Sequence, residues 1–151
     1  MTPLHSGQLS VLRVQAALHA LFPFFALLAA KSGWLGPLVP PAAIGGAALL
    51  LAAWAFLMPI RRYRSWGYEM EEDELHIQHG LWTRVRTIVP FGRVQHIDLA
   101  QGPVERQFGV ATLILHTAGT RNSEVVLPGL EPAEAGRIRD LIRSKIRQDV
   151  A

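Results

Sequence analysis

The chain has 151 residues, no cysteine and a formal net charge of +3. Its length fits one small domain with an appendage, and the lack of cysteine excludes disulfides, thiolate metal sites and a cysteine nucleophile. Only Arg13 and Lys31 are charged before residue 61, whereas 13 Lys or Arg and 12 Asp or Glu follow from there. The second part therefore carries a formal charge of only +1, so its charge gives no reason to expect a nucleic-acid partner.

Two apolar segments open the chain, at about residues 11–30 and 38–60. Each is long enough to cross a bilayer core of roughly 30 Å, which takes about 20 apolar residues as a helix. The loop between them is so short that the two helices must form a hairpin. We expect a membrane hairpin over residues 1–63 and a cytoplasmic domain over residues 64–151.

The direction of insertion follows from the basic residues. Three arginines follow the second span, at Arg61, Arg62 and Arg64, whereas the loop between the spans has one lysine, Lys31. The positive-inside rule therefore places both termini in the cytoplasm. Aromatic residues suited to the membrane interfaces are Trp34 at the outer end and Tyr63 and Trp66 at the inner end.

Two other interpretations of these segments are open, a cleaved signal peptide and a buried hairpin of a soluble protein. The first lacks a basic cluster before the apolar run, and a second span follows it. The second would need far more covering protein than the remaining residues supply. Within the first span, Gln15 and His19 share a helix face and are expected to form an interhelical hydrogen bond, or else to line a path.

After the arginines the pattern changes to short strands. Leu75 and Ile77 alternate with His76 and Gln78, and further strand-like runs follow at intervals marked by glycine turns. Several strands in a row with no helix between them predict an antiparallel barrel or sandwich.

One amphipathic helix closes the chain. Pro132 suits its first position, and Ile138, Leu141, Ile142 and Ile146 form one apolar stripe. That stripe is expected to cap an open end of a barrel. The fold class is therefore mainly β with helices: a two-helix transmembrane hairpin, then an antiparallel barrel capped by a C-terminal helix.

The residues of the second part also look familiar. The stretch from Asp73 to Gly119 resembles the bacterial pleckstrin-homology (PH) domain membrane proteins of the YdbS-like type. The residues that carry the resemblance are Gly80, Pro90, Arg93, Gln95, Gln101, Arg106, Gly109 and Gly119. The resemblance implies a PH-like barrel held at the bacterial inner membrane by two spans, commonly beside a larger sibling with further copies of the domain.

Lipid binding can be weighed from the charges. In phosphoinositide-binding PH domains the loop between the first two strands is basic, but here it reads EEDE, and four carboxylates would repel a phosphate. Basic residues elsewhere offer an anion or lipid contact, at Arg84 and Arg86 and along the last helix at Arg139, Arg143 and Arg147. For that helix a solvated charged face is the competing interpretation.

No catalytic motif is recognisable in the sequence, so we expect a protein that is not an enzyme and has no cofactor. The one alternative is a zinc set from His76, His96 and His116 with Asp98, should the strands bring them together. His76 and His79 project to opposite faces of one strand and cannot chelate together.

The leading hypothesis is thus a membrane-anchored PH-like interaction module that assembles with itself or with a sibling PH-domain membrane protein. The alternative is a module that binds anionic lipid headgroups. Membrane lipids are expected contacts in either case, at least through the arginines that follow the second span.

Overall fold

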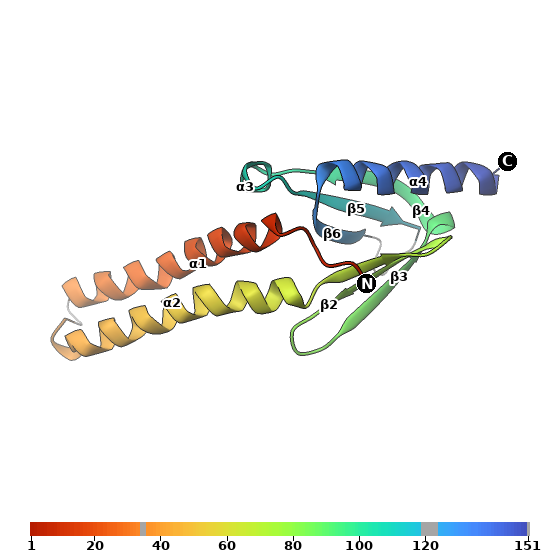
Figure 1. The fold of residues 1–151 in the computed structure, drawn as a ribbon. Helices are drawn as coiled ribbons and strands as arrows, with labels where there is room; N and C mark the ends of the chain where they lie inside the picture. Colours follow the sequence, from red (N-terminus) through yellow and green to blue (C-terminus); the bar gives the residue numbers. More distant parts are fainter. Residues whose placement is uncertain (34–35, 119–123, 151) are drawn as a thin grey trace. The chain divides into compact units, whose positions relative to one another are not determined.

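The computed structural model describes residues 1–33, 36–118 and 124–150, with side chains up to residue 147 in the last helix (Figure 1). The chain divides into two compact units, one of residues 12–61 and one that joins residues 1–11 to the chain from Arg62 onward. The helices are α1 (Gly7–Ser32), η1 (Gly36–Leu38), α2 (Pro41–Arg64), η2 (Phe91–Arg93), α3 (Pro103–Gln107) and α4 (Pro132–Val150). The strands are β1 (Gly67–Met70), β2 (Glu74–His79), β3 (Val85–Pro90), β4 (Val94–Ala100), β5 (Ala111–Thr117) and β6 (Glu124–Leu130).

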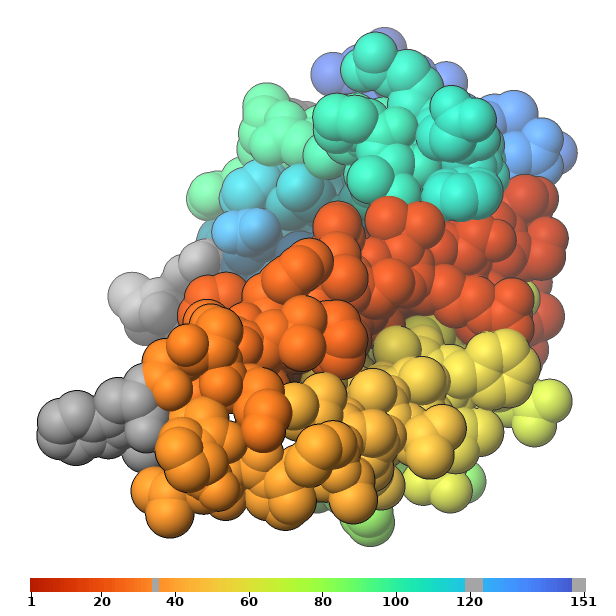
Figure 2. All heavy atoms as spheres, turned by 90° about the vertical axis from the view of Figure 1, so that its left-hand side faces the viewer, coloured from red at the N-terminus to blue at the C-terminus, as the bar shows by residue number. Residues whose placement is uncertain are grey.

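The helical unit consists of most of α1 and α2, which lie side by side in both views (Figures 1 and 2). Both helices are long and apolar enough to cross a membrane. Helix α1 contains the predicted span 11–30, whereas α2 begins at Pro41, three residues after the predicted start of the second span, because Leu38 belongs to η1. Arg13 of α1 lies over the ring of Phe56 of α2, 5.4 Å from its centroid, which is a favourable cation–π distance. At the other end Lys31 donates to the carbonyl oxygens of Gly36 and Val39 at 3.0 and 2.9 Å and so holds the connecting loop.

The polar pair in α1 behaves differently from the expectation. His19 Nδ1 lies 2.6 Å from the carbonyl oxygen of Gln15, one turn earlier in the same helix. This contact uses one imidazole nitrogen within α1, so His19 does not form the predicted hydrogen bond to α2 through that nitrogen.

The strands form two antiparallel three-stranded sheets, in the orders β1-β2-β3 and β4-β5-β6. Alternation explains them: Leu75 and Ile77 of β2 are buried while their neighbours are partly exposed, and β5 buries Leu113 and Leu115 in the same way. The prediction of antiparallel strands with a C-terminal helix after them is confirmed. Its finer part, a closed barrel, is not confirmed, because no described strand of one sheet pairs with a strand of the other. The expectation of no helix between the strands was wrong, because the short helix α3 separates β4 from β5 and begins at Pro103, which suits a first helical position.

Helix α4 covers the core with one face. Its residues Ala135, Ile138 and Ile142 are buried with the sheet residues, and Ile146 packs against the same cluster. The predicted stripe was wrong at Leu141, whose side chain is 40% exposed. Leu141 is one residue before Ile142, so its side chain points about 100° away from that of Ile142 and off the buried face. The buried face of α4 includes Ala135 instead.

The first residues of the chain pack onto the sheets of their own unit. Thr2 exchanges backbone hydrogen bonds with Tyr68 of β1, and the His5 amide donates to the carbonyl oxygen of Gly129 at 2.8 Å. The side chain of Leu4 is 3% exposed and belongs to the core. The N-terminal segment is therefore part of the β-sheet unit.

Candidate functional site

A cavity of about 460 Å³ lies between strand β4 and the second half of helix α4. Its lining residues are Gln95, His96, Ile97, Arg143, Ile146 and Arg147. Strand β4 is an edge strand of its sheet, since β5 is its one neighbour in the sheet order. We call this feature the β4–α4 groove.

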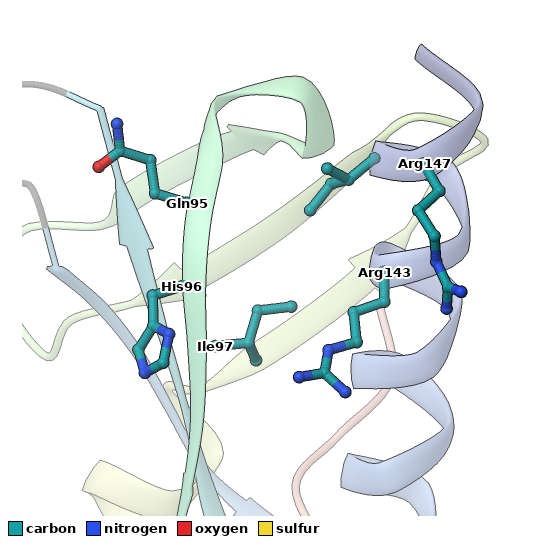
Figure 3. Close-up of a pocket in the computed structure, with 6 residues that line it drawn as sticks. Gln95, His96, Ile97, Arg143 and Arg147 are labelled. Carbon is teal, nitrogen blue, oxygen red and sulfur yellow. The ribbon is translucent and has the colours of Figure 1, made fainter. Parts of the chain in front are cut away.

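The local structure of β4 sets the floor of the β4–α4 groove. The register between β4 and β5 shifts between Val94 and His96, an irregularity of the kind that re-aims side chains. Figure 3 shows Ile97 and Arg143 extending toward each other across the cavity, while Gln95 and His96 lie on the side of the strand away from the helix. Ile97 and Ile146 are partly buried and supply an apolar surface.

The electrostatics of the groove are set by two arginines. Arg143 and Arg147 are one helical turn apart on α4 and both are exposed. Neither forms an ion pair with any side chain that the structure describes, whereas Arg139 pairs with its neighbour Asp140 at 2.9 Å. Guanidinium groups form paired hydrogen bonds with carboxylates and phosphates, so this groove is suited to an anionic group flanked by apolar surface.

The structure does not bring the predicted basic residues into one site. Arg143 and Arg147 line the β4–α4 groove, but Arg139, Arg84 and Arg86 do not. Arg84 and Arg86 belong to the loop and first residues of β3, and Arg61, Arg62 and Arg64 to the last turns of α2. Arg64 lines a separate cavity of about 280 Å³ with Trp66 and Gln78.

The aromatic residues proposed for the inner interface have partners inside the protein. The Tyr63 hydroxyl donates to the carbonyl oxygen of Leu4 at 2.7 Å. Trp66 stacks on His79, with ring centroids 4.7 Å apart and planes inclined by 22°, and it packs against the core. Trp34 lies outside the described residues. Contact of these residues with lipid stays a prediction.

The residues that carried the family resemblance mainly shape the backbone. Gly80 and Gly109 have φ angles of +121° and +63°, the left-handed region that favours glycine. Gln101 donates to the carbonyl oxygen of Val110 at 2.9 Å. The others lie where the chain turns or bends: Pro90 and Arg93 bound the corner at η2, Gln95 follows in β4 and Arg106 sits in α3. Gly119 lies outside the described residues.

The histidines fall into two groups. Asp98 accepts from His96 Nε2 at 2.8 Å and lies 3.1 Å from His116 Nε2, so three members of the predicted zinc set do meet on the β4-β5-β6 sheet. His76 instead lies on the other sheet, 3.1 Å from Glu74 and 3.7 Å from Glu71. The predicted four-residue set is therefore divided between two sheets.

The acidic turn lies where the sequence placed it, except that Glu74, the last of the four predicted loop residues, is the first residue of β2. Strand β1 ends at Met70 and β2 begins at Glu74, so Glu71, Glu72 and Asp73 form the loop of the first hairpin. Lys145 of α4 pairs with Asp73 at 3.0 Å. The loop that is basic in phosphoinositide-binding PH domains is acidic here.

A second cavity, of about 470 Å³, lies on the other side of α4 against β1. Tyr68 donates to Glu134 Oε1 at 2.7 Å, and Arg137 also lines this space. Burial of the hydroxyl, assisted by the hydrogen bond to Glu134, raises the pKa of Tyr68 well above its ordinary value. The phenol therefore stays protonated at any physiological pH.

The bacterial PH domain model matches residues 17–146 of this chain. The chain belongs to the bacterial PH domain family. It is 44% identical over 87 residues to UPF0699 transmembrane protein YdbS of Bacillus subtilis, covering 58% of this chain and 53% of YdbS. It is 26% identical over 136 residues to UPF0699 transmembrane protein YdbT of the same organism, covering 89% of this chain and 27% of YdbT.

These comparisons confirm the resemblance inferred from the sequence, that of a YdbS-like PH-domain membrane protein. No solved structure matches this chain. The chain spans about half the length of YdbS and about a quarter of the length of YdbT, so the activity of those whole proteins is not carried over to it.

Sequence reasoning missed two parts of the PH-domain surface. It placed the arginines and Ile146 on the last helix but did not find Ile97 beside them, because the register shift in β4 breaks the simple alternation. It also missed the N-terminal residues that pack on β1, for which no periodic signal exists over so short a segment. Their one visible sign was Leu4, an apolar residue ahead of the first span.

Proposed function

We propose that this chain is a membrane-anchored PH-domain interaction module, which assembles at the cytoplasmic face with a second copy of itself or with a sibling PH-domain membrane protein. The observation that carries the proposal is the β4–α4 groove. It lies beside an edge strand, and its two arginines have no acidic partner among the described side chains. No catalytic role is part of this proposal.

The groove fits an extended acidic segment of a partner. Such a segment can pair its backbone with the free edge of a sheet, which is a common mode of peptide recognition. Its carboxylates would reach Arg143 and Arg147, and an apolar side chain would rest on Ile97 and Ile146. Two membrane proteins of one organism, YdbS and YdbT, both resemble this chain, which supports a sibling as the partner.

The membrane hairpin supports the same proposal by a different route. Two apolar helices hold every copy of the domain at one surface, so partners meet in two dimensions at a raised effective concentration. The arginines in the last turns of α2 favour insertion with the domain in the cytoplasm. A groove of modest size can then support assembly that would be weak in solution.

The test uses the natural absence of cysteine. Ile97→Cys places one thiol in the groove of the full-length protein, and Ser144→Cys places one on an exposed part of α4 that does not line the groove. A thiol-reactive crosslinker is applied in native membranes and the products are identified by mass spectrometry. We expect Ile97→Cys to capture a second copy or another PH-domain protein and Ser144→Cys not to.

A charge reversal adds the decisive control. Arg143→Glu with Arg147→Glu should abolish capture through Ile97→Cys while leaving the protein folded. Equal capture from both thiol positions, or capture that survives the charge reversal, would contradict assembly through the groove.

The same two arginines also favour a second function, binding of an anionic lipid headgroup, because guanidinium groups bind phosphates as they bind carboxylates. Native mass spectrometry of the detergent-solubilised full-length protein distinguishes the two. Retention of phosphatidylglycerol that disappears in the Arg143→Glu, Arg147→Glu variant supports the lipid function. Equal lipid retention by both forms removes it.

A further inference from the structure

The loop between β2 and β3 carries two apolar side chains in the open. Leu81 is 40% exposed and Trp82 is 90% exposed, the latter being the most exposed of the large apolar residues that the structure describes. The loop has a defined shape: Gly80 has a φ angle of +121°, and a Cβ there would lie against the carbonyl group of Thr83. The turn thus holds Leu81 and Trp82 outward from the sheet.

The strand register gives the place of this loop. Gly67, at the start of β1, pairs with Gln78 of β2, so the residues after Gln78 run past the beginning of β1. The stacking of Trp66 on His79 shows the same alignment, and Arg64 and Ser65 share a small cavity with Gln78. The β2–β3 loop therefore lies at the end of the sheet where the chain enters β1, next to Arg64 and Ser65.

The loop also reaches beyond that arrival point. The three residues from His79 to Trp82 can span at most roughly 10 Å at about 3.3 Å per residue, and the bends at residues 81–83 make the actual span shorter. Arg62 and Arg64 lie in the last turn of α2. The same helix is apolar and long enough to cross a membrane. A membrane surface at the end of α2 is thus within reach of the loop.

The charges around the loop match an anionic membrane surface. Arg84 and Arg86 follow Trp82 and are both exposed. No acidic residue occurs between Glu74 and Asp98 in the sequence, so the whole β2–β3 hairpin beyond its first residue is basic or neutral. Tryptophan with nearby arginine is typical of segments that sit in the bilayer interface.

We propose that Leu81 and Trp82 insert into the bilayer interface as a third membrane contact, with Arg84 and Arg86 against anionic headgroups. The partner is the lipid surface itself. This contact would hold the β1-β2-β3 sheet at a fixed angle to the membrane and restrict how the domain presents its other faces. The inference rests on α2 ending at a membrane surface and is independent of the occupant of the β4–α4 groove.

The test is a depth measurement with spin labels on the full-length protein. Leu81→Cys leaves Trp82 in place, and the protein is reconstituted in vesicles of phosphatidylethanolamine with phosphatidylglycerol as the anionic lipid. Collision of the label with oxygen, which concentrates in the bilayer, is compared with collision with a water-soluble nickel complex. The matched control is Glu72→Cys, an exposed position in the loop at the opposite end of the same sheet.

We expect the ratio of oxygen to nickel collisions at position 81 to be at least several-fold higher than at position 72. A second substitution, Trp82→Asp, should return the label at position 81 to the aqueous ratio. If Leu81→Cys does not fold, Thr83→Cys reports on the same loop.

Two results would overturn the proposal. A label at position 81 with the high nickel accessibility of position 72 would show that the loop stays in water. Low accessibility to both reagents would show that the loop is covered by protein instead of lipid. Because neither reading involves Ile97 or the α4 arginines, failure here is distinguishable from failure of the proposed assembly.

Discussion

The two sides of helix α4 differ in whether their charged groups have partners within the chain. On the β1 side, Tyr68 donates to Glu134, and Arg137 lies in the same cavity. On the β4 side, Arg143 and Arg147 face a cavity of similar volume with no acidic partner among the described side chains. Tyr68 and Glu134 are thus partners within the chain and support stability, whereas the two arginines on the β4 side are suited to a group from outside.

This difference explains why a single helix can serve both as a structural cover and as one wall of a binding site. The buried face of α4, through Ala135, Ile138 and Ile142, fixes the helix on the sheets. The flanking residues are then free to differ between the two sides. We therefore expect substitutions on the β1 side of α4 to lower stability and substitutions on the β4 side to weaken binding.

The largest expected effect on stability is at the buried face of α4, which lies between its β1 and β4 sides. Ile142→Ala should lower the free energy of unfolding by about 2–5 kcal/mol, because it leaves a cavity at a fully buried position. Leu141→Ala, one residue away, should cost less than about 1 kcal/mol, since that side chain is already partly in water. Urea denaturation of the full-length protein in detergent micelles measures both. Equal losses would mean that the buried face of α4 is assigned wrongly.

The next effect tests the β1 side. Tyr68→Phe removes a hydrogen bond to a carboxylate and should destabilise the protein by about 1.5–3 kcal/mol. The same denaturation experiment measures it, with Tyr63→Phe as the matched tyrosine, whose hydroxyl donates to a neutral backbone carbonyl and should cost about 0.5–1.5 kcal/mol. A negligible loss for Tyr68→Phe would remove the distinction between the two sides.

The pH dependence sharpens that result. Because the pKa of Tyr68 is raised in the folded protein, its contribution is fully present below the unfolded value of about 10 and is lost as the pH rises above it toward the folded value. The stability difference between the native protein and Tyr68→Phe should therefore be constant from neutral pH to about 10 and shrink at higher pH. Thermal unfolding of both proteins over this range measures the difference. Shrinkage already near neutral pH would show that another group is responsible.

The smallest stability effect is expected on the β4 side. Arg143→Ser with Arg147→Ser should change the free energy of unfolding by less than about 0.5 kcal/mol per site, as for exposed residues without partners. The same pair should nevertheless reduce crosslinking through Ile97→Cys. A large loss of stability would mean that these arginines have structural partners after all, and the contrast between the two sides would fail.

Much of the fold follows from local sequence. The two apolar segments, the alternation in β2 and the Pro132 start of α4 each report a local preference, and the structure confirms the helices and the strand that they predict. The acidic first hairpin was also readable, because Glu71, Glu72 and Asp73 are contiguous. The resemblance to bacterial PH domains added the family, which the comparison confirms.

The surfaces that suggest function depend on distant contacts instead. The β4–α4 groove joins residues about 46 positions apart, from Ile97 to Arg143, and a register shift decides which β4 side chains reach it. The packing of Thr2 on Tyr68 and the alignment of the β2–β3 loop with the start of β1 likewise follow from strand pairing. Sequence alone determined which residues prefer membrane, strand or helix, since those preferences act over a few residues. Only the tertiary structure decided which of them meet. The contacts among the sheets, helix α4 and the N-terminal segment are set by the packing of one shared core.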